Sequence, residues 1–320
     1  MGMREPSLST EGVWFGTGGT SGTEPMLLTS SCSSERSGVC VVRGGPKLVG
    51  PLRAVREVWD ARHLTYELAR ADLVRHTSRL RLGILWWFLD PLVLALIYWG
   101  LVDQLLGRGE SIHPRYWLFL FLGLIVWKQF AQCLSGCSGV YNRRQGLIKN
   151  LAVPLVTLPG AVVLQTFHLF VQAILVVIVF LGISGGVSLG WIQLLGLLGI
   201  QFITMFGIGL MVAAPMARQP DLRELVPHFL KVLFYLSPVL YSFDFLQAKL
   251  EGSEYLGWLN VYILVHPVGD LIDAYRHVLL DDGVLSLNGW VILVARSALY
   301  FSAGCFLQDR FQRHLLEGIR

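Results

Sequence analysis

The feature that most constrains this sequence is a series of apolar runs long enough to cross a lipid bilayer. A helix needs roughly 20 mostly apolar residues to span the hydrocarbon core. Hydrophobic residues make up 53% of the chain and charged residues only 15%, against about a quarter in soluble proteins. Most of the chain is therefore expected to form one all-α membrane bundle. Five runs meet the length requirement, at about residues 84–106, 116–141, 156–183, 190–216 and 289–308.

A sixth run, residues 226–245, is apolar apart from Lys231. We expect it to cross the membrane as well, which gives six transmembrane helices. The transmembrane domain then covers residues 83–310 and leaves a short cytoplasmic C-terminal tail, residues 311–320.

The segment between the runs at residues 226–245 and 289–308 contains an apolar stretch that is too short to cross the membrane. The stretch from Leu256 to Val268 has only about 13 residues, which suits a re-entrant or interfacial helix. His266-Pro267 would end this helix, and a second helix would run from Asp270 to Leu280, before Asp281-Asp282-Gly283. We predict a pair of re-entrant helices on the outward side.

Lysine and arginine set the expected orientation, because cytoplasmic flanks retain positive charge. With the N-terminus inside, fifteen such residues fall in cytoplasmic segments, and only Arg108, Arg115, Lys249 and Arg276 fall outside. Both termini are therefore expected in the cytoplasm, with the chain in the inner (cytoplasmic) membrane.

Two segments precede the first span. Residues 1–50 are rich in Gly, Ser and Thr without apolar periodicity, so we expect a disordered tail, and a mispredicted start codon is an alternative. Residues 51–82 are expected to form a cytoplasmic amphipathic helix. Its apolar residues would lie on the lipid bilayer and its arginines toward phosphates, or the helix would pack on a partner. Its candidate interface residues are Trp59, Tyr66 and Arg75.

The sequence offers little for catalysis or metal binding. The five cysteines have no ligand spacing, and Cys133 and Cys137 share one face of an apolar helix. We interpret them as small hydrophobic residues. No Ser-His-Asp order, metal cluster or paired carboxylates appear, so we expect no catalytic residue, no metal and no nucleic-acid partner.

Three local patterns resemble the permease subunits of type-2 ABC exporters, the family that exports O-antigen, capsule and teichoic acid chains. The first is Leu82-Gly83-Ile84-Leu85-Trp86-Trp87-Phe88-Leu89-Asp90-Pro91-Leu92, at the start of the first span. The second runs from Phe119-Leu120 through Gly123 and Trp127 to Leu147-Ile148-Lys149-Asn150 and Pro154. The third is Asp221-Leu222-Arg223 followed by Leu236-Ser237-Pro238-Val239-Leu240-Tyr241. The resemblance covers about residues 55–310. Two residues depart from the family pattern: Lys128, and His266 where Asn-Pro is usual.

The resemblance implies a homodimer with a lipid-linked polysaccharide or polyol-phosphate chain as substrate. It also implies a separate ABC ATPase subunit, which would hold ATP and magnesium. The sequence itself contains no Gly-x-x-x-x-Gly-Lys-Ser/Thr motif and is not expected to bind a cofactor. Coupling to the ATPase would use a short polar segment after the second span. The alternative is that this segment is an ordinary positively charged cytoplasmic loop. Its residues are Arg143, Arg144, Gln145, Leu147, Ile148, Lys149 and Asn150.

A path for a glycan would use aromatic rings, since the C–H faces of sugars stack on them. Trp and Tyr also collect at membrane interfaces as anchors, which is the alternative for most aromatics here. Lys128 lies near the middle of its span, where a charge usually faces an interior cavity. The candidates for the translocation path are Trp127, Lys128, Tyr235 and Tyr241.

Two other functions remain open at this point. The first is export of a small drug or lipid by the same fold, for which a narrow and fully apolar pore is expected. The second is a membrane-embedded transferase, for which Asp221, Arg223 and His228 come closest to an acid/base set.

Overall fold

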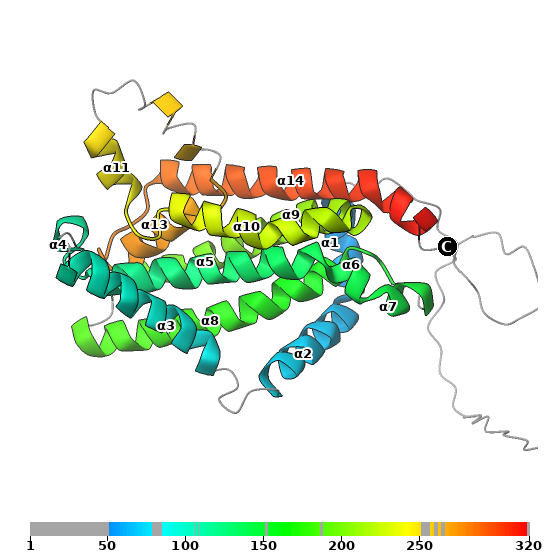
Figure 1. Ribbon diagram of the computed structural model, residues 1–320, viewed down its shortest axis with the longest axis horizontal. Helices are drawn as coiled ribbons and strands as arrows, with labels where there is room; N and C mark the ends of the chain where they lie inside the picture. The colour runs from blue at the N-terminus through cyan, green and yellow to red at the C-terminus, as the bar shows by residue number, and fades with distance from the viewer. Residues whose placement is uncertain are drawn as a thin grey trace, which may run out of the picture. The chain divides into compact units, whose positions relative to one another are not determined.

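The computed structural model describes residues 51–78, 85–105, 107, 109–150, 153–185, 188–250, 257–258, 262–263 and 266–318. The described residues form helices and connecting turns, with no β-strand among them (Figure 1). The expected tail, residues 1–50, lies outside the described residues, as do Leu82-Gly83-Ile84 of the first pattern.

The helices follow one another with short connections. In chain order they are α1 (Pro51–Asp60), α2 (Arg62–Ser78), α3 (Leu85–Trp99), η1 (Gly100–Leu105), α4 (Gly109–Ile112), α5 (Tyr116–Ser138), α6 (Val140–Arg143), α7 (Gln145–Asn150), α8 (Thr157–Gly185), η2 (Leu189–Ile192), α9 (Gln193–Arg218), α10 (Pro220–Leu236), α11 (Phe243–Leu250), α13 (Gly269–Leu279) and α14 (Leu287–Gly318).

Five segments are long and apolar enough to cross a membrane, by length and composition. They are Leu85–Leu105, Tyr116–Ser138, Thr157–Ile183, Gly190–Arg218 and Leu287–Phe311. These agree with the five long runs of the sequence to within a few residues. The chain is therefore a multi-pass, all-helical membrane protein.

The sixth expected span, residues 226–245, corresponds to α10 only in part. The helix ends at Leu236 because Ser237 has an extended backbone (φ −71°, ψ 148°), the conformation favoured before a proline such as Pro238. Since α10 has 17 residues, it is not among the five spans, and the predicted count of six is not confirmed.

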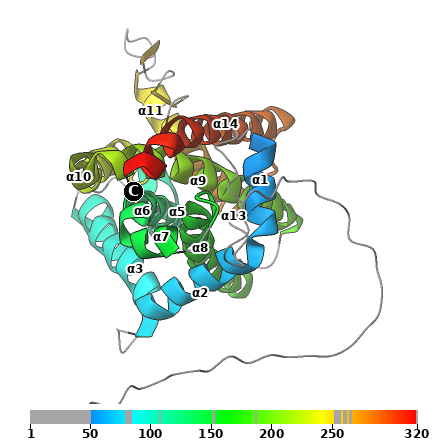
Figure 2. The ribbon, with the colours of Figure 1, turned by 90° about the vertical axis from the view of Figure 1, so that its right-hand side faces the viewer.

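The bundle is built around α5, which lies among α3, α8, α9 and α10 when seen end-on (Figure 2). Its most apolar stretch is 78% buried, whereas that of α3 is 17% buried and that of α14 is 22% buried. The side chains on the outer faces of α3 and α14 are mostly apolar and exposed. Apolar side chains can be exposed in this way when the surrounding medium is lipid rather than water.

Two glycines allow α9 and α14 to approach closely. A Cβ atom on Gly207 would lie 2.5 Å from the backbone nitrogen of Phe301, and one on Gly304 would meet the carbonyl oxygen of Gly207. Small residues at helix contacts are common in membrane proteins, because packing rather than hydrophobicity drives association there. Both positions require glycine for this contact.

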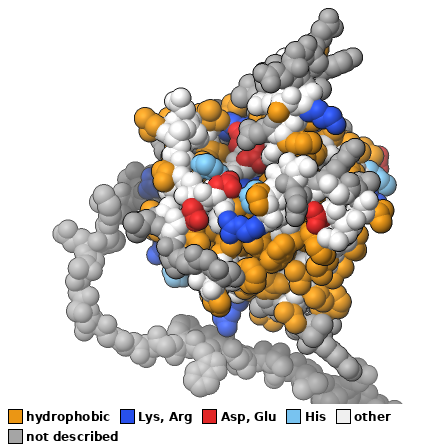
Figure 3. Space-filling model, turned by 90° about the vertical axis from the view of Figure 1, so that its left-hand side faces the viewer, with side chains coloured by type: hydrophobic (Ala, Val, Ile, Leu, Met, Phe, Trp, Pro, Cys, Tyr) orange, Lys and Arg blue, Asp and Glu red, His pale blue; other side chains and the backbone are white. Residues whose placement is uncertain are grey.

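The two ends of the bundle differ. We call them the α4 end, where α4, α11 and α13 lie, and the α7 end, where α1, α6 and α7 lie (Figure 1). The face at the α4 end shows charged and histidine side chains near its middle and hydrophobic side chains along one flank (Figure 3).

The segment expected as one amphipathic helix is divided in two. α1 and α2 meet at Ala61, and the segment turns there. α1 packs on α14 and α8, while α2 packs on α8. The buried residues of this pair are small, namely Ala54, Thr65 and Ala69.

The segment between α10 and α14 contains α11 and α13. The expected helix Asp270–Leu280 is present as α13, and the turn that follows it includes Asp282 with a positive φ of 50°. The expected helix Leu256–Val268 falls mostly outside the described residues, and the predicted re-entrant pair is not confirmed.

Candidate functional site

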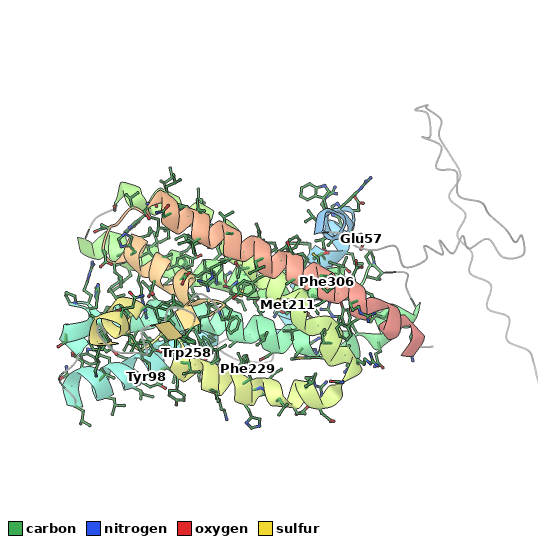
Figure 4. All side chains as sticks on the ribbon, turned by 90° about the horizontal axis from the view of Figure 1, so that it is seen from above. Glu57, Tyr98, Met211, Phe229, Trp258 and Phe306 are labelled. Carbon is green, nitrogen blue, oxygen red and sulfur yellow. The ribbon has the colours of Figure 1, made fainter. Side chains whose placement is uncertain are left out.

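A groove of about 320 Å³ opens between α3 and α10, with α5 as its floor. α3 and α10 each pack on α5, and the ring centroids of Tyr98 and Phe234 lie 6.0 Å apart across the groove. Tyr98 and Phe229 of α10 lie toward the same edge of the bundle, away from Glu57 of α1 (Figure 4). The lining residues are Asp90, Pro91, Leu94, Tyr98, Leu124, Trp127, Lys128, Ala131, Leu230, Lys231, Phe234 and Tyr235.

The helix α10, which forms one wall of the groove, carries a row of polar side chains. Residues spaced by three and four positions share one face of a helix, and at this spacing α10 carries exposed polar side chains. We call them the polar stripe: Glu224, His228, Lys231 and Tyr235.

The neighbouring face of α10 is apolar and also exposed, with the same spacing. It consists of Leu225, Phe229, Val232 and Leu236. The third face, which includes Val226 and Leu230, is buried in the bundle. α10 therefore separates a polar surface from an apolar one, and two residues of the polar stripe, Lys231 and Tyr235, line the groove.

The floor of the groove contains the charge that the sequence placed in the middle of a span. The Nζ atom of Lys128 donates to Oδ2 of Asp90 at 2.8 Å and to the carbonyl oxygen of Trp87 at 3.0 Å. Pro91 has no N–H group, so it cannot donate to the carbonyl four residues earlier in α3, which is that of Trp87. Lys128 therefore supplies the donor that the proline removes.

The two partners of this ion pair differ in exposure. The side chain of Lys128 is 14% exposed and that of Asp90 is 60% exposed. The ammonium also lies 5.3 Å from the ring centre of Trp87, within the range of a cation–π interaction. The lysine is thus held by α3, and the carboxylate faces the open groove.

Three of the four predicted path residues meet in this groove. Trp127 is nearly buried and packs against Phe234, with ring centroids 5.6 Å apart. Lys128 lies beside it, and Tyr235 is exposed on the wall. Tyr241 does not line the groove. It lies in the turn after α10, where its hydroxyl donates to the carbonyl oxygen of Leu236.

The predicted coupling segment forms α6 and α7 at the α7 end. Arg143 donates to the carbonyl oxygen of Gly136, and burial lowers its pKa, with the neighbouring Arg144 as a second cause. Arg144 forms an ion pair with Asp72 of α2. These two arginines therefore have partners within the chain.

The other residues of the coupling segment differ in exposure. Leu147 and Ile148 are half-buried and pack against the core. Gln145 and Lys149 are exposed, and the side chain of Asn150 lies outside the described residues.

The predicted interface residues lie on the outside of α1 and α2. Trp59 and Tyr66 are 67% and 58% exposed, and Arg75 is exposed as well. Arg62 stands over the ring of Trp59 at 5.5 Å. Large aromatic side chains in this position suit a membrane interface, where one edge of the ring meets lipid and the other meets water.

Sequence reasoning missed a buried arginine at the α4 end. Arg276 of α13 is 3% exposed, and its guanidinium donates to the carbonyl oxygens of Phe119, Pro238 and Val239 at 2.6–3.1 Å. Asp273 lies 3.3 Å away. Burial lowers the pKa of Arg276 to about 10, partly offset by Asp273. This arginine joins α13, the start of α5 and the turn that ends α10.

A second missed arginine is Arg296 of α14, which pairs with Asp270 of α13 and donates to the carbonyl oxygens of Ile263 and His266. It lies within the last apolar run, where a charge is costly. Its position in that run was the signal in the sequence that could have indicated a buried partner.

The groove, its internal ion pair and the membrane-spanning helices around it define this chain as a multi-pass membrane protein. The proteins similar to it support that class. No protein-family model matches the chain.

An O-antigen export system permease protein RfbA from Myxococcus xanthus is 24% identical over 84% of this chain and 100% of its own length. An RfbA from Klebsiella pneumoniae is 29% identical over 72% of this chain and 82% of its own. The polysialic acid transport protein KpsM of Escherichia coli is 26% identical over 73% of this chain and 89% of its own length. The homologues of this chain are type-2 ABC exporter permeases, which confirms the resemblance found in the sequence.

Proposed function

We propose that this chain is the membrane subunit of an ATP-driven exporter that moves a lipid-linked polysaccharide or polyol-phosphate chain across the cytoplasmic membrane. The observation that carries the proposal is the groove between α3 and α10, with Lys231 and Tyr235 of the polar stripe on one wall and Lys128 in its floor. The O-antigen and polysialic acid systems of its homologues support the same substrate class.

The groove serves as one half of the translocation path. A cation at the centre of a membrane-spanning helix costs about 2.5–3.5 kcal/mol when it faces lipid, so the polar stripe is unsuited to the hydrocarbon. A second copy of the chain, related by a two-fold axis, would cover it. The apolar face of α10 would then lie beside the partner or the lipid at the seam.

The topology of the proposal has six spans. α10 is about 25 Å long at 1.5 Å per residue, slightly less than the hydrocarbon thickness of about 30 Å, and it runs between the two ends of the bundle (Figure 1). With α10 as the sixth span, both termini lie on the side of the α7 end. We assign that side to the cytoplasm, because α1, α2, α6 and the residue after α6 bring seven arginines there, namely Arg53, Arg56, Arg62, Arg70, Arg75, Arg143 and Arg144. α11 and α13 would enter the membrane from the outward side without crossing it.

ATP hydrolysis would take place on a partner subunit. α7 is a short helix beyond the end of α5, where a soluble domain can reach it. Leu147 and Ile148 would provide an apolar contact and Lys149 an exposed charge at its rim.

Small-molecule export by the same fold is less well supported. That function was expected to have a narrow and fully apolar pore, whereas the groove contains Asp90, Lys128 and Lys231. Charged and aromatic side chains together suit a long polar chain that slides without a fixed register.

The experiment that tests the proposal is purification of the tagged chain from its native membrane in a mild detergent. We expect an ABC ATPase to copurify in a ratio of two copies to two copies of this chain. Absence of any nucleotide-binding protein, with the chain itself intact and folded, would count against the exporter.

A further inference from the structure

The groove contains one ammonium group with no partner among the described residues. Lys231 is exposed on α10 and lines the groove, and it forms none of the ion pairs found in the described part of the chain. The other ammonium group, that of Lys128, is already paired with Asp90 at 2.8 Å. The lining residues therefore carry one uncompensated positive charge.

The carboxylates of α10 do not neutralise it. Glu224 lies seven residues before Lys231, roughly 10 Å along the helix axis, and it pairs with Arg223 at 3.2 Å. Asp221 is a further turn away. A positive charge bordered by apolar walls acts more strongly than one in open water, because the local dielectric constant is lower.

We propose that Lys231 is the centre of a binding site for a phosphoryl group of the exported chain. This inference rests on the proposed function and names the chemistry that the groove selects. Lys231 approaches from the α10 wall, and Tyr98 and Tyr235, whose hydroxyl groups can donate, line the same space. A terminal phosphoryl group, as in octyl phosphate, has three acceptor oxygens for donors on different walls, whereas a carboxylate has two.

The ion pair in the floor provides the second cation. Because the carboxylate of Asp90 is 60% exposed, an arriving phosphoryl group can replace it at Lys128 while Asp90 turns to water. Lysine also suits a passing ligand, since its ammonium acts as a point charge without the fixed fork geometry of arginine. The site binds the anion without holding it in one orientation.

The experiment measures the reactivity of Lys231 in the full chain, reconstituted in phosphatidylcholine nanodiscs. An amine-reactive reagent labels lysines, and mass spectrometry quantifies each one. The probes are octyl phosphate, octanoate, octyl glucoside and glycerol phosphate. Lys249 of α11, which is exposed and remote from the groove, is the internal control.

We expect octyl phosphate to slow the labelling of Lys231 about tenfold and to leave Lys249 unchanged, while octyl glucoside affects neither. Protection by glycerol phosphate as well would place the phosphoryl group in the glycan chain. Protection by octyl phosphate alone would place it at the lipid carrier. Equal protection by octanoate, or no protection of Lys231, would overturn the proposal.

A binding titration with two variants completes the test. For octyl phosphate, Lys231→Met should raise the Kd about tenfold and Lys231→Arg less than threefold. Because Lys231 is exposed, neither change should affect folding. Unchanged affinity in Lys231→Met would also overturn the site, yet copurification of the ATPase would still support the exporter.

Discussion

Asp72 of α2 forms an ion pair with Arg144, the residue between α6 and α7. The pair connects the segment before the first span to the segment that we assign to ATPase contact. Asp72 accepts from Nη2 of Arg144, while Nη1 is buried with no hydrogen-bond partner among the described residues, so the arginine depends on this carboxylate. α2 and α7 should therefore respond together when either one is displaced.

Asp72→Asn should loosen α7. Removing one partner of a largely buried pair leaves the other unsatisfied, at a cost of about 1–3 kcal/mol. We expect faster tryptic cleavage at Arg143, Arg144 and Lys149 and a lower melting temperature. The matched control is Asp60→Asn, which breaks an exposed pair with Arg56 at 3.9 Å and should have little effect. Equal cleavage rates in both variants would contradict the link.

Replacing both Leu147 and Ile148 with Asp should weaken binding of the ATPase or separate hydrolysis from export. We expect Leu147 and Ile148 to bind an apolar groove on the ATPase, which charged side chains would not enter. The membrane spans of this chain remain unchanged. ATPase activity and export are measured in the same vesicles, and Gln145→Asp is the control on the same helix. Full export with normal ATPase binding would contradict a coupling role for α7 and leave it as a positively charged cytoplasmic segment.

Arg276→Met should destabilise the α4 end. Three carbonyl oxygens and Asp273 would lose their donor in a buried site, at a cost of about 3–5 kcal/mol. Thermal unfolding in detergent should show a clear decrease in melting temperature, whereas Lys249→Met on the exposed side of α11 should show none. If Arg276→Met unfolds at the temperature of the parent chain, Arg276 does not hold the turn after α10.

His266 should make stability depend on pH. Burial lowers its pKa to about 4, with Arg296 as a second cause, while the imidazole of an unfolded chain has a pKa of about 6.5. Between these values the unfolded state binds more protons, so stability falls as pH falls, by up to about 1.4 kcal/mol per pH unit. His266→Asn should remove this component. Unfolding is measured at pH 7.5 and 4.5, with exposed His63→Asn as the control, and parallel losses in His266→Asn and the parent would contradict it.

The sequence predicted the spans well because apolar length is a local property. The start and end of α5 and α9 agree with the predicted runs, residues 116–141 and 190–216, to within three residues. The end of α10 depended on Ser237-Pro238, a local signal that the hydropathy of residues 226–245 concealed.

The groove could be predicted only in part. A charge in the middle of a span pointed to Lys128, but its partner Asp90 is 38 residues away, and only the packing of α3 on α5 brings them together. Lys231 stood out in its run, yet the role of α10 as a wall depends on the same packing. Arg276 was not found, because most of its partners are backbone carbonyls, which no residue type reveals.

Export of the glycan tests the central claim most directly. In the native organism, deletion of the gene should leave the lipid-linked glycan inside the cell and remove it from the surface. The intact chain and Lys249→Met should restore surface glycan, whereas Lys128→Met, at equal protein level and with the ATPase still bound, should restore less than about a tenth of it. Surface glycan that persists in the deletion strain, or full restoration by Lys128→Met, would contradict a path through the groove between α3 and α10.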